Sequence, residues 1–232
     1  MSITTTTTPP FSFPREYSFP PFFTRQTNLT THHAQLTKWA SLVLAYCRHH
    51  RIFKLTLSGI PVTSSSSSAS ANEPTTITTT STTPQQQKNE LFHNSKINRR
   101  LSLADAREVF DFLRKDGRAE YILSNNKDSS FSAAPEGGIG GVGGGGGGGG
   151  DVVWVYWRTP EEWAALIEAW VEQTGQKGSV LTLYELTEGD TTCGTEFHGL
   201  DPDLLQKALS ILVKRAKAQI FGQEDSQGVK FF

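Results

Sequence analysis

Thr159-Pro160-Glu161-Glu162-Trp163 marks the point at which this sequence begins to repeat an earlier order of elements. A threonine cap, a proline at the first helical position and a glutamate three residues after the cap are together typical of a helix start. Gly175 is a residue type that commonly ends helices. Between these signals the apolar side chains recur at helical spacing, at Trp163, Leu166, Ile167, Trp170 and Val171. We therefore predict a helix from Thr159 to Gly175.

The rest of the second half follows from the same kinds of signal. Residues 179–183 are β-like, and residues 184–187 are expected to turn into a short helix. Asp201-Pro202 predicts the start of a further helix, whose inward face holds Leu204, Leu205, Ala208, Leu209 and Leu212. Residues 219–221 and 229–232 are predicted to form a closing hairpin around a turn that ends in Gly228.

The first half shows the same order. Residues 31–51 have a helical stripe, residues 52–57 are β-prone, and residues 91–100 are expected to form a short helix. A second long helix is capped by Ser102 and stopped by Gly117, and residues 119–123 and 152–157 read as paired strands. Each half therefore runs helix, strand, helix, helix, strand, turn, strand. This order predicts an α+β, mainly helical protein made of two tandem winged-helix domains.

The predicted domains carry two insertions. Residues 58–87 are almost wholly Ser, Thr, Pro and Gln, and residues 131–150 end in consecutive glycines. Neither composition can bury enough apolar surface to offset the entropy of ordering, so we expect disordered loops, the later one in the wing of the first domain. We predict a flexible tail over 1–16, a first winged helix over 17–158 and a second over 159–232.

Composition restricts the function classes. The 232 residues hold 22 basic and 23 acidic side chains, a net charge of -1, which argues against a protein whose main task is to neutralise phosphate. Only two cysteines occur, Cys47 and Cys193, which favours a reducing compartment. The threonine-rich start is unlike a signal peptide, and no apolar run approaches the roughly 20 residues that span a bilayer. We expect a soluble, cytoplasmic protein.

Sites for chemistry are weakly indicated. Cys193, His198 and Asp201 supply nucleophile and base types, but they lie in a polar loop without an oxyanion motif. The group Cys47, His49 and His50 lacks a second pair of ligands at zinc spacing. We expect no catalytic residue, no metal and no cofactor. Nucleic-acid binding stays open as the alternative for a winged helix, although the cations of the last long helix are interpreted as a solvated face (Lys207, Lys214, Arg215 and Lys217).

A stretch rich in proline and aromatic residues precedes the first predicted helix. Adjacent prolines favour an extended, polyproline-like backbone that displays aromatic side chains, and the five candidate contact residues are Phe19, Pro20, Pro21, Phe22 and Phe23. Two interpretations remain open from the residues alone. Phe22 and Phe23 either clamp onto the first helix of their own domain or plug into a groove of a partner.

Several motifs spread over both halves resemble the small-subunit family of the ESCRT-II endosomal sorting complex (the vacuolar protein sorting-associated protein 25 family). They are Tyr17-Ser18-Phe19-Pro20-Pro21-Phe22-Phe23-Thr24-Arg25-Gln26, Leu91-Phe92-His93-Asn94, Trp157-Arg158-Thr159-Pro160-Glu161-Glu162-Trp163, Thr182-Leu183-Tyr184-Glu185-Leu186-Thr187-Glu188-Gly189-Asp190, Glu196-Phe197-His198-Gly199-Leu200 and Gly228-Val229-Lys230-Phe231-Phe232. The Ser/Thr-rich and Gly-rich insertions depart from the family pattern and fall in predicted loops.

The resemblance implies a non-enzymatic subunit with tandem winged helices, present in two copies with one copy each of two larger subunits. It implies that a Pro-Pro-x-Tyr/Phe motif plugs into a larger subunit, and here the motif maps onto Pro20, Pro21, Phe22 and Phe23. Pro14-Arg15-Glu16-Tyr17 is at best a degenerate second copy. The family is cytoplasmic, is recruited to endosomes through the complex, and sorts ubiquitinated cargo into multivesicular bodies.

The resemblance also implies that the second domain recruits the first ESCRT-III subunit. Because first helices of those subunits are basic in the family, the favoured contact is the acidic group Glu185, Glu188, Asp190 and Glu196. The alternative is an ordinary solvated surface, since most exposed charges contribute little.

Overall fold

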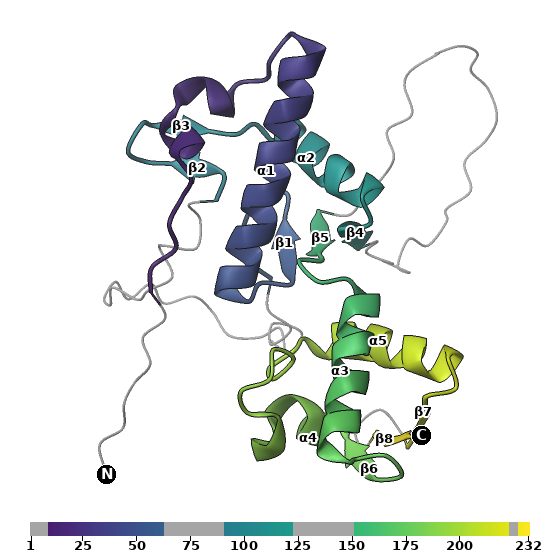
Figure 1. Ribbon diagram of the computed structural model, residues 1–232. Helices are drawn as coiled ribbons and strands as arrows, with labels where there is room; N and C mark the ends of the chain where they lie inside the picture. The colour runs from purple at the N-terminus through teal and green to yellow at the C-terminus, as the bar shows by residue number, and fades with distance from the viewer. Residues whose placement is uncertain (1–8, 63–90, 123–150, 223–226) are drawn as a thin grey trace, which may run out of the picture. The chain divides into compact units, whose positions relative to one another are not determined.

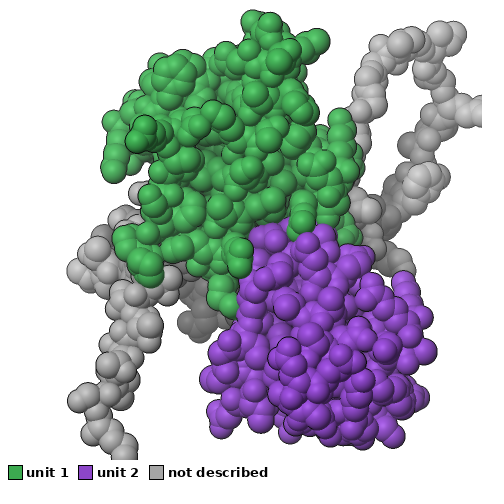
Figure 2. All heavy atoms as spheres, viewed as in Figure 1, with its two compact units in different colours: residues 1–63, 72–155 green, residues 64–71, 156–232 purple. Residues whose placement is uncertain are grey.

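The computed structural model describes residues 9–62, 91–122, 151–222 and 227–232. Its helices and short antiparallel strands form two compact units, which are coloured separately in Figure 2. The described part of the first unit is 9–62, 91–122 and 151–155, and that of the second is 156–222 and 227–232. The predicted mixed class, in which helices outweigh strands, is confirmed. Apart from 58–62, both predicted insertions lie outside the described residues.

In the first unit, α1 (Leu29–His50) begins where the Asn28 side chain accepts a hydrogen bond from the Thr31 amide, and it ends at Arg51. β1 (Lys54–Thr56) follows directly. α2 (Leu103–Lys115) starts at Ser102, whose side chain accepts from the Asp105 amide, so the predicted cap is confirmed. β4 (Ala119–Ile122) and β5 (Val152–Val155) complete a three-stranded antiparallel sheet in the order β1-β5-β4.

The helix predicted for residues 91–100 is wrong. β2 (His93–Asn94) and β3 (Arg99–Arg100) form a small antiparallel hairpin there, in which His93 pairs with Arg100. Asn98 takes a left-handed conformation with φ 49°, which asparagine tolerates better than most residues and which a helix interior does not allow. Leu91 and Phe92 are buried just before the hairpin.

The second unit starts with the confirmed helix. α3 (Pro160–Thr174) has the full capping box between Thr159 and Glu162, and Gly175 ends it in a left-handed conformation. β6 (Val180–Thr182), α4 (Leu183–Glu188), the 3₁₀ turn η5 (Asp190–Thr192) and α5 (Pro202–Lys214) follow in the predicted order. β7 (Ala218–Phe221) and β8 (Gly228–Phe231) form the closing hairpin, and the sheet order is β6-β8-β7.

The division between the units falls between Val155 and Tyr156, three residues before the predicted boundary. Residues just after it contact the second unit: the Trp157 ring lies edge-on to Trp163, and Lys207 Nζ donates to the Tyr156 hydroxyl at 2.8 Å. Aromatic contacts therefore tie the chain to the second unit before α3 begins.

Each unit is built around a tryptophan on its first helix. Trp39 on α1 and Trp163 on α3 are almost fully buried, and α1 packs on α2 as α3 packs on α5. Cys47 is buried on α1, and this burial raises the pKa of its thiol well above the usual value. Among the described residues, no helix is both long enough and apolar enough to cross a membrane.

Candidate protein-interaction site

The N-terminal segment, residues 9–27, contains two 3₁₀ turns, η1 (Arg15–Ser18) and η2 (Pro20–Phe23). The predicted polyproline-like backbone is therefore wrong for η2. The Phe22 amide donates to the Phe19 carbonyl at 2.9 Å, and the Thr24 amide donates to the Pro21 carbonyl at 3.2 Å. The fixed φ of proline suits a 3₁₀ turn as well as a polyproline helix, and a first-turn residue needs no amide donor. The backbone hydrogen bonds within the turn select the 3₁₀ conformation over the polyproline one.

Two phenylalanines of η2 pack onto their own domain. The Phe22 ring stacks on the Trp39 indole with centroids 4.4 Å apart and an interplanar angle of 6°. The Phe23 ring meets the same indole edge-on at 5.3 Å. Only 6% of Phe22 and 4% of Phe23 is exposed. In the isolated chain these side chains occupy the clamp position that was one of the two open interpretations.

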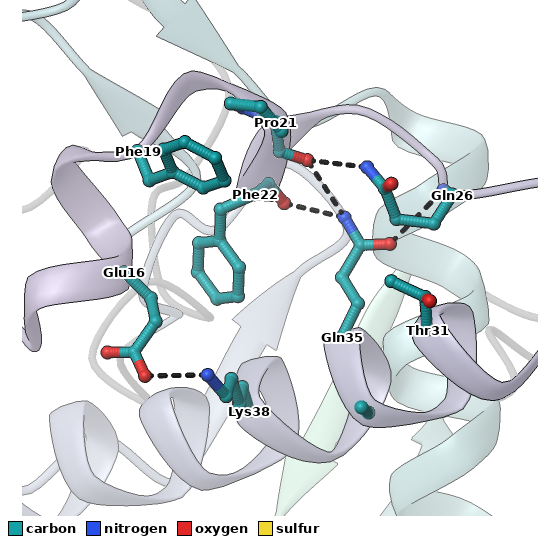
Figure 3. A pocket seen from close by; sticks show the side chains of 9 residues that line it. Glu16, Phe19, Pro21, Phe22, Gln26, Thr31, Gln35 and Lys38 are labelled. Carbon is teal, nitrogen blue, oxygen red and sulfur yellow. Dashed lines mark hydrogen bonds and ion pairs between the residues drawn. The ribbon is translucent and has the colours of Figure 1, made fainter. Parts of the chain in front are cut away.

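Polar side chains of α1 hold the backbone of η2. Gln35 Nε2 and Trp39 Nε1 both donate to the Phe22 carbonyl, at 2.8 and 2.9 Å. Gln35 Nε2 also donates to the Thr24 carbonyl at 2.9 Å, and Figure 3 shows its side chain pointing into the turn. A carbonyl that accepts two buried donors is strongly fixed, because breaking the contact would leave buried polar groups unsatisfied. The turn is thus preorganised.

Further contacts anchor both sides of η2. Lys38 Nζ lies 2.7 Å from Glu16 Oε1, and this hydrogen bond is the main cause of the lowered pKa of Glu16. On the other side, Arg25 lies 2.8 Å from Glu108 of α2. The buried Asn94 Nδ2 donates to the Tyr17 carbonyl at 2.7 Å, which joins η1 to the β2–β3 hairpin. Figure 1 shows the two turns, in purple, beside β2 and β3.

Phe19, Pro20 and Pro21 are the predicted contact residues that remain exposed. Phe19 is 59% accessible, although its neighbours Phe22 and Phe23 are buried. Beside it a pocket of about 200 Å³ lies between η2 and α1, lined among others by Phe19, Pro21 and Lys38 (Figure 3). Of the five predicted contact residues, three are therefore exposed (Phe19, Pro20 and Pro21) and two are buried (Phe22 and Phe23).

The upstream residues also contact α1. Tyr17, the last residue of the degenerate motif, is buried, and Phe13 stacks on its ring at 4.1 Å. Phe11 meets Tyr46 edge-on at 5.2 Å. Residues 9–16 thus lie along α1, where a flexible tail was predicted, while residues 1–8 are outside the described residues.

The four acidic residues predicted to bind a basic partner do not act as one free cluster. Glu185 closes the capping box of α4 with Thr182, and hydrogen bonds from the Thr182 backbone and side chain lower the pKa of its carboxyl. Glu196 forms an ion pair with Arg158. Glu188 and Asp190 are exposed, at the end of α4 and the start of η5.

Several residues that the sequence offered as weak candidates for catalysis or metal binding make structural contacts instead. Cys193 is exposed, His198 Nδ1 lies 3.2 Å from the Thr192 hydroxyl, and Asp201 caps α5 by accepting from the Asp203 amide. His49 Nε2 contacts the Pro9 carbonyl at 2.8 Å, while Cys47 is buried. Across the ranges that the structure describes, no three His, Cys, Asp or Glu side chains are grouped so as to hold a metal.

Sequence reasoning missed Gln35 and Asn94, which hold the N-terminal segment. Gln35 lies one turn before Trp39 on α1 and is buried, so a polar residue in register with an apolar stripe was the available signal. Asn94 gave no comparable signal, because its partner Tyr17 is 77 residues away in the sequence.

Comparisons with known proteins agree with the resemblance. A family model described as ESCRT-II complex subunit matches residues 16–201. The chain is 37% identical to vacuolar protein-sorting-associated protein 25 of Xenopus laevis over 222 residues, covering 96% of this chain and 99% of that protein. The corresponding Homo sapiens and Dictyostelium discoideum proteins are 36% and 37% identical, and the match covers 98% and 96% of their lengths.

Solved structures give the same result. A crystal structure of subunit VPS25 of the endosomal trafficking complex ESCRT-II is similar with a TM-score of 0.67 at 25% identity, covering 94% of this chain and 98% of that one. A chain in the crystal structure of the endosomal complex ESCRT-II (VPS22/VPS25/VPS36) has a TM-score of 0.66 at 26% identity, with the same coverage. From its sequence and its fold, this chain belongs to the ESCRT-II complex subunit family.

Proposed function

We propose that the chain is a non-enzymatic structural subunit of an ESCRT-II complex and docks onto the two larger subunits through its N-terminal segment. Family membership supports the complex, and the similar solved assembly contains VPS22 and VPS36 beside VPS25. In this proposal two copies of the chain join one copy of each larger subunit. The complex sorts ubiquitinated cargo into multivesicular bodies, and the chain reaches the endosome from the cytoplasm only through it.

The observation that carries the docking proposal is the exposed Phe19 on a fixed turn. The Phe19 side chain is 59% exposed and stands beside two exposed prolines. Because the backbone of the turn is already fixed, binding through these residues costs little backbone entropy. Aromatic anchors of this kind dominate the energetics of many interfaces. Phe19, Pro20 and Pro21 then form the contact, while Phe22 and Phe23 hold them in place from below. Any movement of Phe22 or Phe23 toward the partner would first have to break their packing on Trp39.

The test is the affinity of purified chain for a complex of the two larger subunits, measured by isothermal titration calorimetry. Phe19→Ala is expected to weaken binding by about 2 kcal/mol or more, because a hot-spot aromatic is lost. Leu103→Ala is the matched control, since Leu103 is an equally exposed apolar residue of the same unit, at 63%. Unchanged affinity of Phe19→Ala, or an equal loss in the control, would contradict the docking role.

For the second unit we propose recruitment of the first ESCRT-III subunit through exposed acidic side chains. Glu185, Glu188 and Asp190 are exposed, while Glu185 and Glu196 contribute charge from a helix cap and an ion pair. Glu188→Lys with Asp190→Lys is expected to weaken binding of a basic ESCRT-III helix. The control is Glu161→Lys with Glu172→Lys on α3, and equal binding by all three proteins would refute the acidic contact.

A further inference from the structure

A pocket of about 310 Å³ lies between the N-terminal segment and the turn of the β2–β3 hairpin. Beside the aromatic rings of Phe11, Phe13 and Tyr17, its walls carry groups that can donate hydrogen bonds, at Ser12, Ser18, His93, Ser95 and Lys96. Asn94 lines it too, but its amide is already used, donating to the Tyr17 carbonyl and accepting from the Lys96 amide at 3.0 Å. A pocket rich in donors fits a ligand group that only accepts, such as a carboxylate.

The hairpin beside this pocket carries exposed positive charge, and Lys96 is the cation that lines the pocket. Lys96, Arg99 and Arg100 are exposed within five consecutive residues. Within the described ranges none of the three takes part in an ion pair, and Glu16, the acidic residue nearest to Phe19 in the N-terminal segment, is engaged by Lys38. By contrast, Arg25 of the N-terminal segment forms an ion pair with Glu108 at 2.8 Å. The hairpin therefore presents three cations that have no acidic partner among the described residues.

The pocket adjoins the proposed docking residues. Ser18 lines it, and Phe19 is the next residue in the chain. β3 packs against η2, and the Asn94 hydrogen bond fixes the hairpin to η1. Phe19, Pro20 and Pro21 therefore lie next to the basic hairpin in the fold.

We infer that the β2–β3 hairpin is a second contact site, which receives acidic side chains of the same partner that takes up Phe19, Pro20 and Pro21. This inference rests on the proposed function and specifies its partner: an apolar receptor pocket bordered by aspartates or glutamates. A protein is favoured over a membrane, because lipid-binding basic clusters typically hold about four to eight cations and lie flat. Here the hairpin carries three exposed cations, of which Lys96 lines the pocket, and β3 packs against η2 next to the exposed Phe19.

Such charges act mainly on encounter and register. Rim charges change the association rate and the salt dependence of binding more than they change the buried contact. Screening over a Debye length of about 10 Å at 0.1 M salt should therefore weaken wild-type binding progressively. Phe19 contributes through apolar burial, which salt does not screen in this way.

The experiment measures the affinity of the full chain for the purified complex of the two larger subunits at low and high salt. The test variant is Arg99→Glu with Arg100→Glu, and Lys96→Glu is a milder second variant. The control, Lys214→Glu with Arg215→Glu, reverses two adjacent exposed cations in the second unit. Thermal melts check that each variant folds. We expect the test variant to lose about tenfold in affinity at low salt and most of its salt dependence. The control should bind like wild type.

The outcomes separate the two levels of inference. If wild type binds but the test variant and Lys96→Glu match it in affinity and salt slope, the acidic contact is wrong and the docking proposal stands. If Phe19→Ala also binds like wild type, docking through this surface fails altogether. An equal loss in the control would assign the effect to overall charge. Binding of wild type, but not the test variant, to anionic vesicles or duplex DNA, with subunit affinity intact, would overturn the inference in favour of those ligands.

Discussion

The two units place different elements at the same position in their order. Between its first strand and its second long helix, the first unit has the β2–β3 hairpin, whereas the second unit has α4 and η5. The charges also differ. The described first unit holds thirteen Lys and Arg against seven Asp and Glu, and the second holds seven against ten. A balanced whole-chain charge therefore conceals a basic and an acidic half.

The difference follows from what supports each element. The hairpin is held from outside, because Asn94 donates to the Tyr17 carbonyl and the N-terminal segment packs over Trp39. α4 is held from within, because Thr182 and Glu185 satisfy the first amides of the helix. In the first unit, the N-terminal segment ahead of α1 supports the β2–β3 hairpin. In the second unit, α4 relies on its own capping box.

The largest effect is expected from removing the outside support. Phe22→Ala should destabilise the first unit by about 3 kcal/mol or more, since it empties the space above Trp39. Hydrogen exchange at the Leu101 amide, which donates to the Phe92 carbonyl beside the hairpin, should accelerate, while exchange in α4 stays unchanged. Phe19→Ala is the control and should leave stability as it is. Equal acceleration in both units would break the comparison.

A smaller change acts on the hairpin directly. Asn94→Ala removes the hydrogen bond that the buried Asn94 amide donates to the Tyr17 carbonyl and should cost about 1–3 kcal/mol in chemical denaturation. Ser95→Ala, at an exposed neighbouring position, serves as the control. If Asn94→Ala unfolds at the same denaturant concentration as wild type, outside support for the hairpin is not a major contribution.

The inside support of α4 should be weaker. Thr182→Ala removes the cap and is expected to cost about 1 kcal/mol, with exchange accelerating in α4 but not near the hairpin. Thr191→Ala in η5 is the matched threonine control. A larger loss than that of Asn94→Ala would reverse the ranking of the two supports.

The smallest effect concerns pH. Hydrogen bonds from Thr182 lower the pKa of Glu185 below its ordinary 4.5. A carboxyl whose pKa is lower in the folded state than in the unfolded state stabilises the folded state at pH values above its unfolded-state pKa. This stabilisation is lost as the pH falls through the folded-state pKa. Carboxyl NMR shifts of Glu185 should titrate below 4.5 in wild type, and Thr182→Ala should raise the midpoint. An unchanged midpoint would remove the capping box as the cause.

Local signals predicted most of the fold. Ser102, Thr159 and Asp201 each start the helix that the sequence indicates, and Gly175 ends α3 as expected. These features depend on hydrogen bonds within three or four residues. The errors arose where distant contacts decide. The hairpin at 91–100 depends on Tyr17, and the 3₁₀ turn of η2 packs on Trp39.

The candidate site was predicted in composition and only partly in arrangement. The five residues are contiguous, with Phe19 directly before the turn that Pro20–Phe23 form, but their division into exposed and buried members follows from the position of Trp39. In the acidic group, Glu185 had a second role as a capping residue, which its spacing from Thr182 could have indicated.

The sheet orders β1-β5-β4 and β6-β8-β7 have a consequence for synthesis on the ribosome. In each unit the strand made last lies in the middle, so the two strands made earlier have no partner in their sheet until it emerges. Neither sheet can form by stepwise addition, and each unit is expected to fold late and cooperatively. Because the cost of closing a loop rises only logarithmically with its length, the long segment between β4 and β5 delays this step more than it weakens the product.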